Sequence, residues 1–302
     1  MKKKNLVSII MNCHNGERYL KDSISSVIKQ SHKNWELVFF DNNSTDNSSK
    51  IAKSFKNKKI KYFKSKFVNL GIARKKALEL CKGEYLTFLD CDDYWHKEKL
   101  KTQLNIMQKN LGVGLCFSNS QFFSKNYKRN LYNSRPKDGY IFQDLLKKYF
   151  ISFDTVFIDM KVLAKLKQKF DERFTITHDL DLIIRFSMIT KFIYIDKVLS
   201  FWRIHEKGFS KNKLSIINFE KKLFLNKLKI ILKNNKNKKY LINLFEKNLN
   251  ETYIEEYLIN NNKKMFYKRI FKYNTFNLKN FLIFILMILP GGNKIYINFK
   301  KS

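Results

Sequence analysis

Short apolar runs alternate with segments of helical periodicity along the first 120 residues. The runs of strand length are residues 6–13, 35–41, 60–63, 84–90 and 114–119. Between them apolar residues recur every three or four positions, as Leu20, Ile24 and Val27 do. Strands separated by helices of about 10–15 residues are typical of parallel β–α–β units. The pattern predicts an α/β fold with a Rossmann-like, mostly parallel central sheet flanked by helices.

Turn residues and helix stop signals suggest where the helices lie. The sequence NNSTD, which follows residue 41, is rich in turn and capping residues and precedes a helix expected over 47–55. The segment GIARKKALELCKG, residues 71–83, fits a helix that Gly83 stops.

Beyond residue 120 the pattern is less regular. We expect a helix near 141–149, a strand near 155–159, a helix that begins at His178 and an extended segment over 191–205. After residue 210 the sequence becomes rich in Lys and Asn, and its apolar residues fall roughly along one helical face. The sequence therefore predicts an α/β domain over residues 1–210 and a basic, α-helical C-terminal region over residues 211–302.

The chain is strongly basic. Its 60 Lys and Arg against 26 Asp and Glu give a formal net charge of +34. Residues 211–302 hold 20 Lys and Arg and 5 Glu, so they supply +15 of this charge. Such a balance indicates either an anionic partner or the amino-acid composition that an AT-rich genome produces.

One apolar segment bears on membrane contact. Residues 281–289, FLIFILMIL, are followed by Pro290. A membrane-spanning helix needs about 20 apolar residues, so this run is too short to cross a bilayer. Its basic neighbours favour contact with an anionic membrane surface, and the alternative is a buried C-terminal helix.

The cysteines and the N-terminus indicate a reducing compartment. The four cysteines form no CxxC pair, and the basic start is followed by only a short apolar run that does not resemble a signal peptide. We therefore expect free thiols and a cytoplasmic protein, peripheral on the inner face of the cytoplasmic membrane if it binds lipid.

Three acids crowd into FLDCDDYW, residues 88–95, directly after a predicted buried strand. Asp90, Asp92 and Asp93 would lie at the carboxyl end of that strand, where ligands bind in open α/β sheets. Carboxylates at this spacing can share a divalent cation, and Mg²⁺ and Mn²⁺ prefer oxygen ligands. The cluster predicts a Mn²⁺ or Mg²⁺ site that bridges the protein and a diphosphate.

Four sequence blocks, in order, resemble glycosyltransferase family 2, the inverting, non-processive GT-A type. The blocks are VSIIMNCHNGERYLKDSISSVIKQSHKNWELVFFDNNSTDNS, GIARKKALELCKGEYLTFLDCDDYW, HDLDLIIRF and VLSFWRIHEKGFS. Together they extend over roughly residues 5–210. The resemblance implies a GT-A catalytic domain over residues 1–210.

The resemblance also implies roles for individual residues. Asp179 would be the general base that deprotonates the acceptor hydroxyl. Asp92 and Asp93 would hold the metal, with Asp92 as the ligand and Asp93 either assisting it or orienting the loop. The donor-binding residues would be Asn15, Asp41 at the nucleotide base, Arg74 at the base or diphosphate, Asp90 at the ribose, and Arg203 and His205 at the diphosphate.

The implied reaction moves one sugar from a nucleotide-sugar, with a UDP-sugar favoured, to a hydroxyl of a cell-surface glycan or lipid-linked acceptor. A nucleotidyltransferase is one alternative, but NCHNGERY supplies a single glycine where such enzymes have a Gly-rich phosphate loop. A nucleic-acid-binding protein is the other. No recognised module supports it, so we expect no nucleic acid partner.

The chain departs from the family pattern at several positions. His14, Asn42, Lys75 and His178 stand where Tyr, Asp, Asn and Glu are usual, and the change at His178 puts acceptor recognition in doubt. Two other acids have structural interpretations. We expect Asp46 to cap a helix and Asp181 to pair with Arg185 one helical turn later.

Overall fold

The computed structural model describes residues 3–206 and 213–273. The chain forms two compact units. The first comprises Met1–Leu145 with Tyr149–Phe209, and the second comprises Leu146–Lys148 with Ser210–Ser302.

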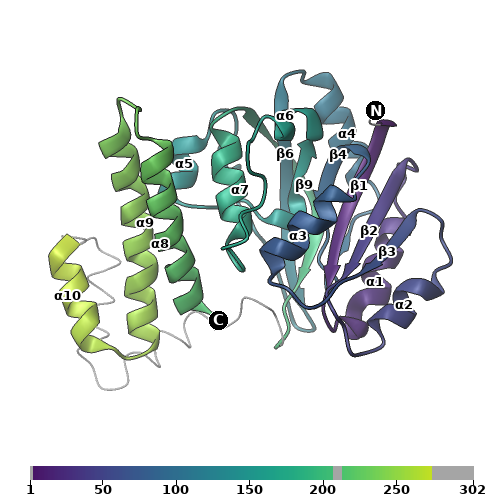
Figure 1. Cartoon of the computed structure of the whole chain (residues 1–302), viewed down its shortest axis with the longest axis horizontal. Helices are drawn as coiled ribbons and strands as arrows, with labels where there is room; N and C mark the ends of the chain where they lie inside the picture. The colour runs from purple at the N-terminus through teal and green to yellow at the C-terminus, as the bar shows by residue number, and fades with distance from the viewer. Residues whose placement is uncertain (1–2, 207–212, 274–302) are drawn as a thin grey trace. The chain divides into compact units, whose positions relative to one another are not determined.

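The first unit is built on one mixed sheet (Figure 1). Its nine strands are β1 (Lys3–Cys13), β2 (Trp35–Asp41), β3 (Ile60–Lys64), β4 (Gly83–Phe88), β5 (Tyr94–Trp95), β6 (Val113–Ser124), β7 (Tyr127–Asn130), β8 (Phe157–Asp159) and β9 (Lys191–Arg203). They are ordered β3-β2-β1-β4-β8-β6-β9-β5, and β7 pairs with β6. The β3-β2-β1-β4 half is parallel, whereas β8 runs antiparallel to both β4 and β6.

Helices connect and flank these strands. They are α1 (Glu17–Ile28), α2 (Ser48–Ser54), α3 (Leu70–Glu79), α4 (Lys99–Lys109), α5 (Phe142–Lys147), the 3₁₀ helix η1 (Phe153–Thr155), α6 (Met160–Ala164) and α7 (His178–Ser187). The α/β class with a parallel sheet region is confirmed. Helix α4 did not figure among the sequence predictions.

Burial on both faces explains the parallel strands. All seven residues of β2 are buried, as expected for a strand covered by helices on both sides. Its one internal acid, Glu36, is satisfied within the sheet, because it accepts hydrogen bonds from the Ser8 hydroxyl at 2.6 Å and the Lys82 N–H at 2.6 Å.

Gly83 has a different role from the predicted helix stop. Helix α3 already ends at Glu79, and Gly83 is the first residue of β4. A Cβ at this position would lie 2.6 Å from the Ser8 nitrogen and 2.7 Å from the Leu6 oxygen. The glycine therefore allows β4 to pack closely against β1. The sequence, which suggested a helix stop at Gly83, did not predict this contact.

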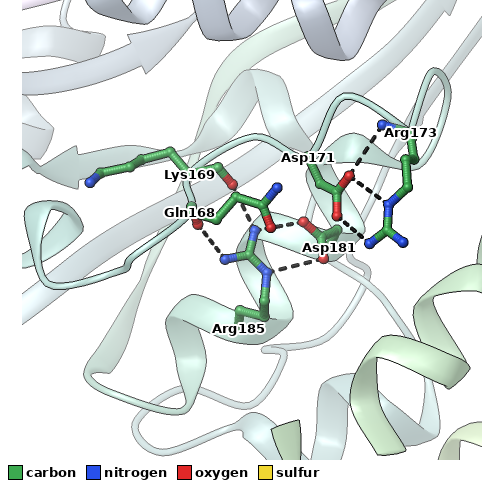
Figure 2. A network of polar contacts seen from close by, with 6 residues as sticks. All are labelled: Gln168, Lys169, Asp171, Arg173, Asp181 and Arg185. Atoms are coloured by element: carbon green, nitrogen blue, oxygen red, sulfur yellow. Dashed lines mark hydrogen bonds and ion pairs between the residues drawn. The ribbon is translucent and has the colours of Figure 1, made fainter. Parts of the chain in front are cut away.

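The segment before α7 is fastened by two arginines (Figure 2). Arg185 pairs with the fully buried Asp181, at 2.6 Å and 3.0 Å, and also donates to the Gln168 carbonyl at 2.5 Å. The predicted pairing of Asp181 with Arg185 is confirmed. This network holds the loop and the start of α7 in one arrangement, with Arg173 pairing with Asp171 nearby.

Helix α3 approaches the same loop closely. A Cβ on Gly71 would lie 2.2 Å from the Phe174 carbonyl oxygen, so only glycine permits this contact. The Asn69 side chain accepts the N–H of Ile72 as the helix cap and donates to the Glu172 carbonyl at 2.8 Å. The start of α3 and the loop before α7 are therefore fixed to each other.

The second unit is helical. It contains α8 (Leu214–Ile231), α9 (Lys238–Ile259) and α10 (Lys263–Tyr273). Helix α9 packs against both α8 and α10, and Phe224 lies 5.0 Å from Phe245 between ring centroids. The predicted C-terminal helical extension is confirmed, while residues 281–289 lie outside the described residues. None of the described helices has the length and apolar character to cross a membrane.

We predict that Asp181→Asn destabilises the first unit. The substitution leaves the Arg185 guanidinium, whose side chain is 8% exposed, without its counter-charge. Breaking a buried pair in this way costs on the order of 3 kcal/mol. The measurement is the free energy of unfolding in urea.

Glu172→Gln is the matched control, because it neutralises an acid whose partner, Lys75, is also exposed. Exposed pairs contribute little to stability, so the control should unfold at nearly the same urea concentration as the unmodified protein. Equal effects of the two substitutions would contradict the proposed role of the buried pair.

Candidate active site

The loops after β1 and β2 interlock at the carboxyl edge of the sheet. Asn15, at a φ of 55°, accepts the Thr45 N–H on its side-chain oxygen at 2.8 Å, and its own N–H donates to the Ser44 hydroxyl at 3.1 Å. Asp46 accepts the N–H groups of Glu17 and Ser48, the first residues of α1 and α2. Asn47 is the formal N-cap of α2, so Asp46 serves the starts of two helices rather than capping one.

Asp41 lies beneath this surface. Its carboxylate is fully buried and accepts the Ser44 N–H at 2.7 Å and the Tyr62 hydroxyl at 2.5 Å. Burial raises the pKa of Tyr62, and its hydrogen bond to Asp41 raises it further. The structure therefore does not bring Asp41 to the same surface as the other predicted site residues.

Asn42 accounts for one departure from the family pattern. Its amide donates to the Val68 carbonyl at 2.7 Å and accepts the Val68 N–H at 3.0 Å. An ionised aspartate has no donor and could make only the second bond. The asparagine thus fastens the loop after β2 to the segment before α3.

Arg74 and Asp90 form an ion pair at the end of β4. The Nη2 atom of Arg74 donates to Asp90 Oδ1 at 2.8 Å, where the arginine side chain is 5% exposed and the aspartate side chain 51%. The guanidinium lies 4.7 Å from the ring centroid of Phe153 and 5.6 Å from that of Phe88.

Two nitrogens of Arg74, Nε and Nη1, are buried without a hydrogen-bond partner among the described residues. Buried polar groups normally have partners, and an exception is a feature that requires an explanation, such as a water or an ion. The cation is held mainly by Asp90 and by the aromatic rings.

Asp179 lies at the start of α7 and is paired with Tyr149. The Tyr149 hydroxyl donates to Asp179 Oδ2 at 3.1 Å. Burial raises the pKa of Asp179, whereas the Leu180 N–H, the Arg74 charge and the Tyr149 hydroxyl lower it, and the net pKa is raised. The same arginine therefore acts electrostatically on both Asp90 and Asp179.

The neighbouring His178 is neutral. Burial, and then the Arg74 charge, lower its pKa well below the ordinary value. Its Nδ1 lies 3.1 Å from the Thr175 carbonyl, which can only accept, so Nδ1 carries the proton. Its Nε2 is buried without a partner in the part of the chain that the structure describes.

Asp92 and Asp93 face different surroundings. Asp92 is part-exposed and its Oδ2 lies 2.8 Å from His205 Nε2. Asp93 is 3% exposed and accepts the Arg203 N–H at 2.8 Å. Burial and the charges of Asp92 and Asp154 raise the pKa of Asp93 well above its usual range.

Arg203 links the acids after β4 to α1. Its Nε donates to the Asp92 carbonyl oxygen at 3.0 Å, and its Nη2 lies 3.4 Å from Asp22. The guanidinium also lies 4.3 Å from the ring centroid of Tyr19. The structure thus brings Arg203 and His205 to the acids after β4, 110 residues or more away in sequence.

Two aromatic residues of this arrangement were not predicted from the sequence. Tyr149, beside Asp179, was included in a helix expected near 141–149, but α5 ends at Lys147 and Tyr149 lies in the loop that follows. Tyr19, whose ring lies 5.1 Å from that of His205, is in α1. Within the described residues, no group of three or more His, Cys, Asp or Glu side chains is arranged to hold a metal ion by itself.

Comparison with solved structures identifies the fold. Residues 1–349 of S. aureus TarS, in a crystal structure with UDP, superpose with a TM-score of 0.62 at 18% identity. The superposition covers 97% of this chain and 80% of that one. The predicted GT-A architecture is confirmed.

Sequence relatives identify the family. An uncharacterised glycosyltransferase of Methanocaldococcus jannaschii is 32% identical over 241 residues, covering 77% of this chain and 81% of that protein. The UDP-Glc:α-D-GlcNAc-diphosphoundecaprenol β-1,3-glucosyltransferase WfgD of Escherichia coli is 35% identical over 159 residues, covering 52% of this chain and 62% of that protein. The family model described as glycosyl transferase family 2 matches residues 8–167, just over half of the chain. The chain belongs to glycosyl transferase family 2.

Proposed function

We propose that the chain transfers a single sugar from a nucleotide-sugar to a hydroxyl of a cell-surface glycan or lipid-linked acceptor, with inversion at the anomeric carbon. The observation that carries the proposal is the position of Arg74. It pairs with Asp90 at the end of β4, and its charge partly offsets the rise that burial causes in the pKa of Asp179 at the start of α7. A donor-binding carboxylate and a candidate base therefore share one cation.

A UDP-sugar is the favoured donor. The printed name of the E. coli relative includes UDP-Glc and a diphosphoundecaprenol-linked acceptor, and TarS was crystallised with UDP. UDP-Glc, UDP and the lipid-linked acceptor are named for those two proteins. They support the proposal that this chain uses a uridine nucleotide-sugar and a lipid-linked or polysaccharide acceptor. Such acceptors are made at the membrane, which supports a protein peripheral on the inner face of the cytoplasmic membrane.

The residues present could hold a divalent cation if the phosphates of the donor supply further ligands. Asp92 Oδ2 and His205 Nε2 are 2.8 Å apart, a separation suited to two adjacent ligands of one ion. With only these two donors the protein leaves positions for phosphate oxygens and water, the usual arrangement for Mg²⁺. When bound, Mn²⁺ or Mg²⁺ would neutralise negative charge that develops on the leaving diphosphate.

Asp93 is better suited to position Arg203 than to bind the metal. Its carboxylate is buried and engaged with the Arg203 N–H, while Arg203 donates to the Asp92 carbonyl. The two residues together fix the turn that presents Asp92. We likewise assign the buried Asp41 to shaping the loop over residues 42–46 rather than to contact with the nucleotide base. Asn15 is exposed and holds the same loop through the Thr45 N–H.

Asp179 is the proposed general base. Its raised pKa moves the carboxylate toward the working pH, where a base is most effective. It would take the proton of the acceptor hydroxyl as that oxygen attacks the anomeric carbon from the side opposite the diphosphate. The direct displacement produces inversion. Tyr149 orients the carboxylate through its hydroxyl.

We predict that Asp92→Ala lowers kcat by about 10²–10³, the usual loss when one electrostatic stabiliser of the transition state is removed. The measurement is nucleotide release from UDP-sugars over a Mn²⁺ titration. Asp196→Ala, which removes an exposed acid outside the site, is the control and should retain full activity. Undiminished turnover of the Asp92 variant would contradict the metal assignment.

Asp179→Asn should abolish transfer while donor binding survives. The amide keeps the size of the side chain and cannot accept a proton, so the loss should reach about 10²–10⁴-fold in kcat. Donor affinity is measured separately by calorimetry. Transfer at an ordinary rate would show that another group is the base.

Tyr149→Phe tests whether the tyrosine positions and tunes that base. The hydroxyl stabilises the ionised carboxylate and lowers the pKa of Asp179, so removing it should raise that pKa. The acidic limb of the kcat/KM profile should then move to higher pH. A merely structural role would reduce activity at every pH without moving the limb, and that result would refute the assignment.

A further inference from the structure

The turn that joins α8 to α9 exposes apolar side chains. Ile230 is 76% exposed, Ile231 38% and Tyr240 50%. We call residues 229–240 the α8–α9 tip. Single exposed apolar residues are common on protein surfaces, but here two at the end of α8 and one at the start of α9 form a local feature.

The exposed residues are not required by the packing of the helices. Leu232 and Leu241, from the same tip, are 1% and 4% exposed and fill the space between α8 and α9. The aromatic pair of Phe224 and Phe245 continues this packing along the helices. Ile230 and Tyr240 therefore point outward although the interior beside them is complete.

All of the charged residues within the tip are basic. The tip has five lysines and no acid, namely Lys229, Lys233, Lys236, Lys238 and Lys239. Lys229 pairs with Glu246 of α9 at 3.1 Å, which leaves the other four to set the charge of the turn. Exposed apolar side chains together with lysines suit a binding partner whose surface has both hydrocarbon and negative charge.

We propose that the α8–α9 tip binds an anionic lipid bilayer. The two isoleucines and the tyrosine enter the boundary between headgroups and acyl chains, and the lysines remain at the level of the lipid phosphates. A tyrosine is suited to this position because its ring is apolar and its hydroxyl polar. Clusters of four to eight basic residues are the usual signature of recognition of anionic lipid.

The test measures binding of the full chain to vesicles by flotation, without donor or acceptor. Vesicles of phosphatidylcholine with phosphatidylglycerol should bind the protein, and vesicles of phosphatidylcholine alone should bind it far more weakly. Binding should also weaken as salt is added. Equal binding to both kinds of vesicle would overturn the proposal.

Variants locate the binding surface. Ile230→Ser should reduce affinity about tenfold through lost apolar burial. Lys236→Gln with Lys239→Gln should reduce it about 25-fold, because each lysine near an anionic surface contributes a factor of about five. Wild-type affinity in both variants would overturn the proposal.

Two controls match these changes. Phe219→Ser removes an exposed apolar residue of α8 about 16 Å along the helix from Ile230. Lys56→Gln with Lys58→Gln removes two exposed charges from the first unit. Both controls should bind as the unmodified protein does, and equal losses in a control and its tip variant would overturn the proposal.

The thermal midpoint of Ile230→Ser in lipid-free buffer separates a bilayer from another covering. An unchanged midpoint supports a surface that is free to bind lipid. A fall of several degrees means that the protein itself covers Ile230, and it would overturn the proposal. Because the assay contains no substrate, its failure leaves the proposed sugar transfer unaffected.

Discussion

The buried guanidinium of Arg74 is the charge around which the candidate site is arranged. A buried cation requires a counter-charge, and Asp90 supplies it at 2.8 Å. Burial raises the pKa of Asp179 and lowers that of His178 at the start of α7, and the charge of the same guanidinium favours a lower pKa at both residues. Helix α3 can carry Arg74 to this position because Gly71 allows close approach to the loop before α7. Packing of one helix therefore sets the electrostatics of residues more than 100 positions apart.

Polar contacts between loops keep the rest of the site in place. Asn15 holds the loop after β2, Asn42 ties that loop to Val68, and Asp93 fixes the backbone of Arg203. Catalysis by electrostatic stabilisation requires groups that are held in place before the reaction begins. Asn15 and Asp93, which the family resemblance implied as a donor-binding and a metal-binding residue, thus both fix the geometry of neighbouring loops.

Much of the fold could be predicted because its signals are local. Residues 35–41 form a mostly apolar run of strand length, and β2 has those bounds. The acids after β4 were identified from their position behind a buried strand. Other features depend on contacts distant in sequence: Gly83 is needed because of Ser8 and Leu6 on β1, and the direction of β8 depends on its neighbours in the sheet.

The candidate site, like the fold, could be predicted only as far as its signals are local in the sequence. A motif identifies which acids belong to it, but gives no information on which way each carboxylate points. Asp41 ends β2 and Asp92 lies in the loop after β4. Asp41 is fully buried against Tyr62, whereas Asp92 is part-exposed beside His205. Tyr149 was missed because its contact with Asp179 joins a loop to the start of α7, 30 residues away in sequence.

A crystal structure with UDP and Mn²⁺ tests the central claim most directly, namely that the acids after β4 and Asp179 form one site around Arg74. The account predicts the ion between Asp92, His205 and the diphosphate. It also predicts that Asp179 faces the space for the sugar from the side opposite the phosphates, with the pair of Arg74 and Asp90 intact. A nucleotide bound elsewhere, or Asp179 on the same side as the leaving diphosphate, would contradict it.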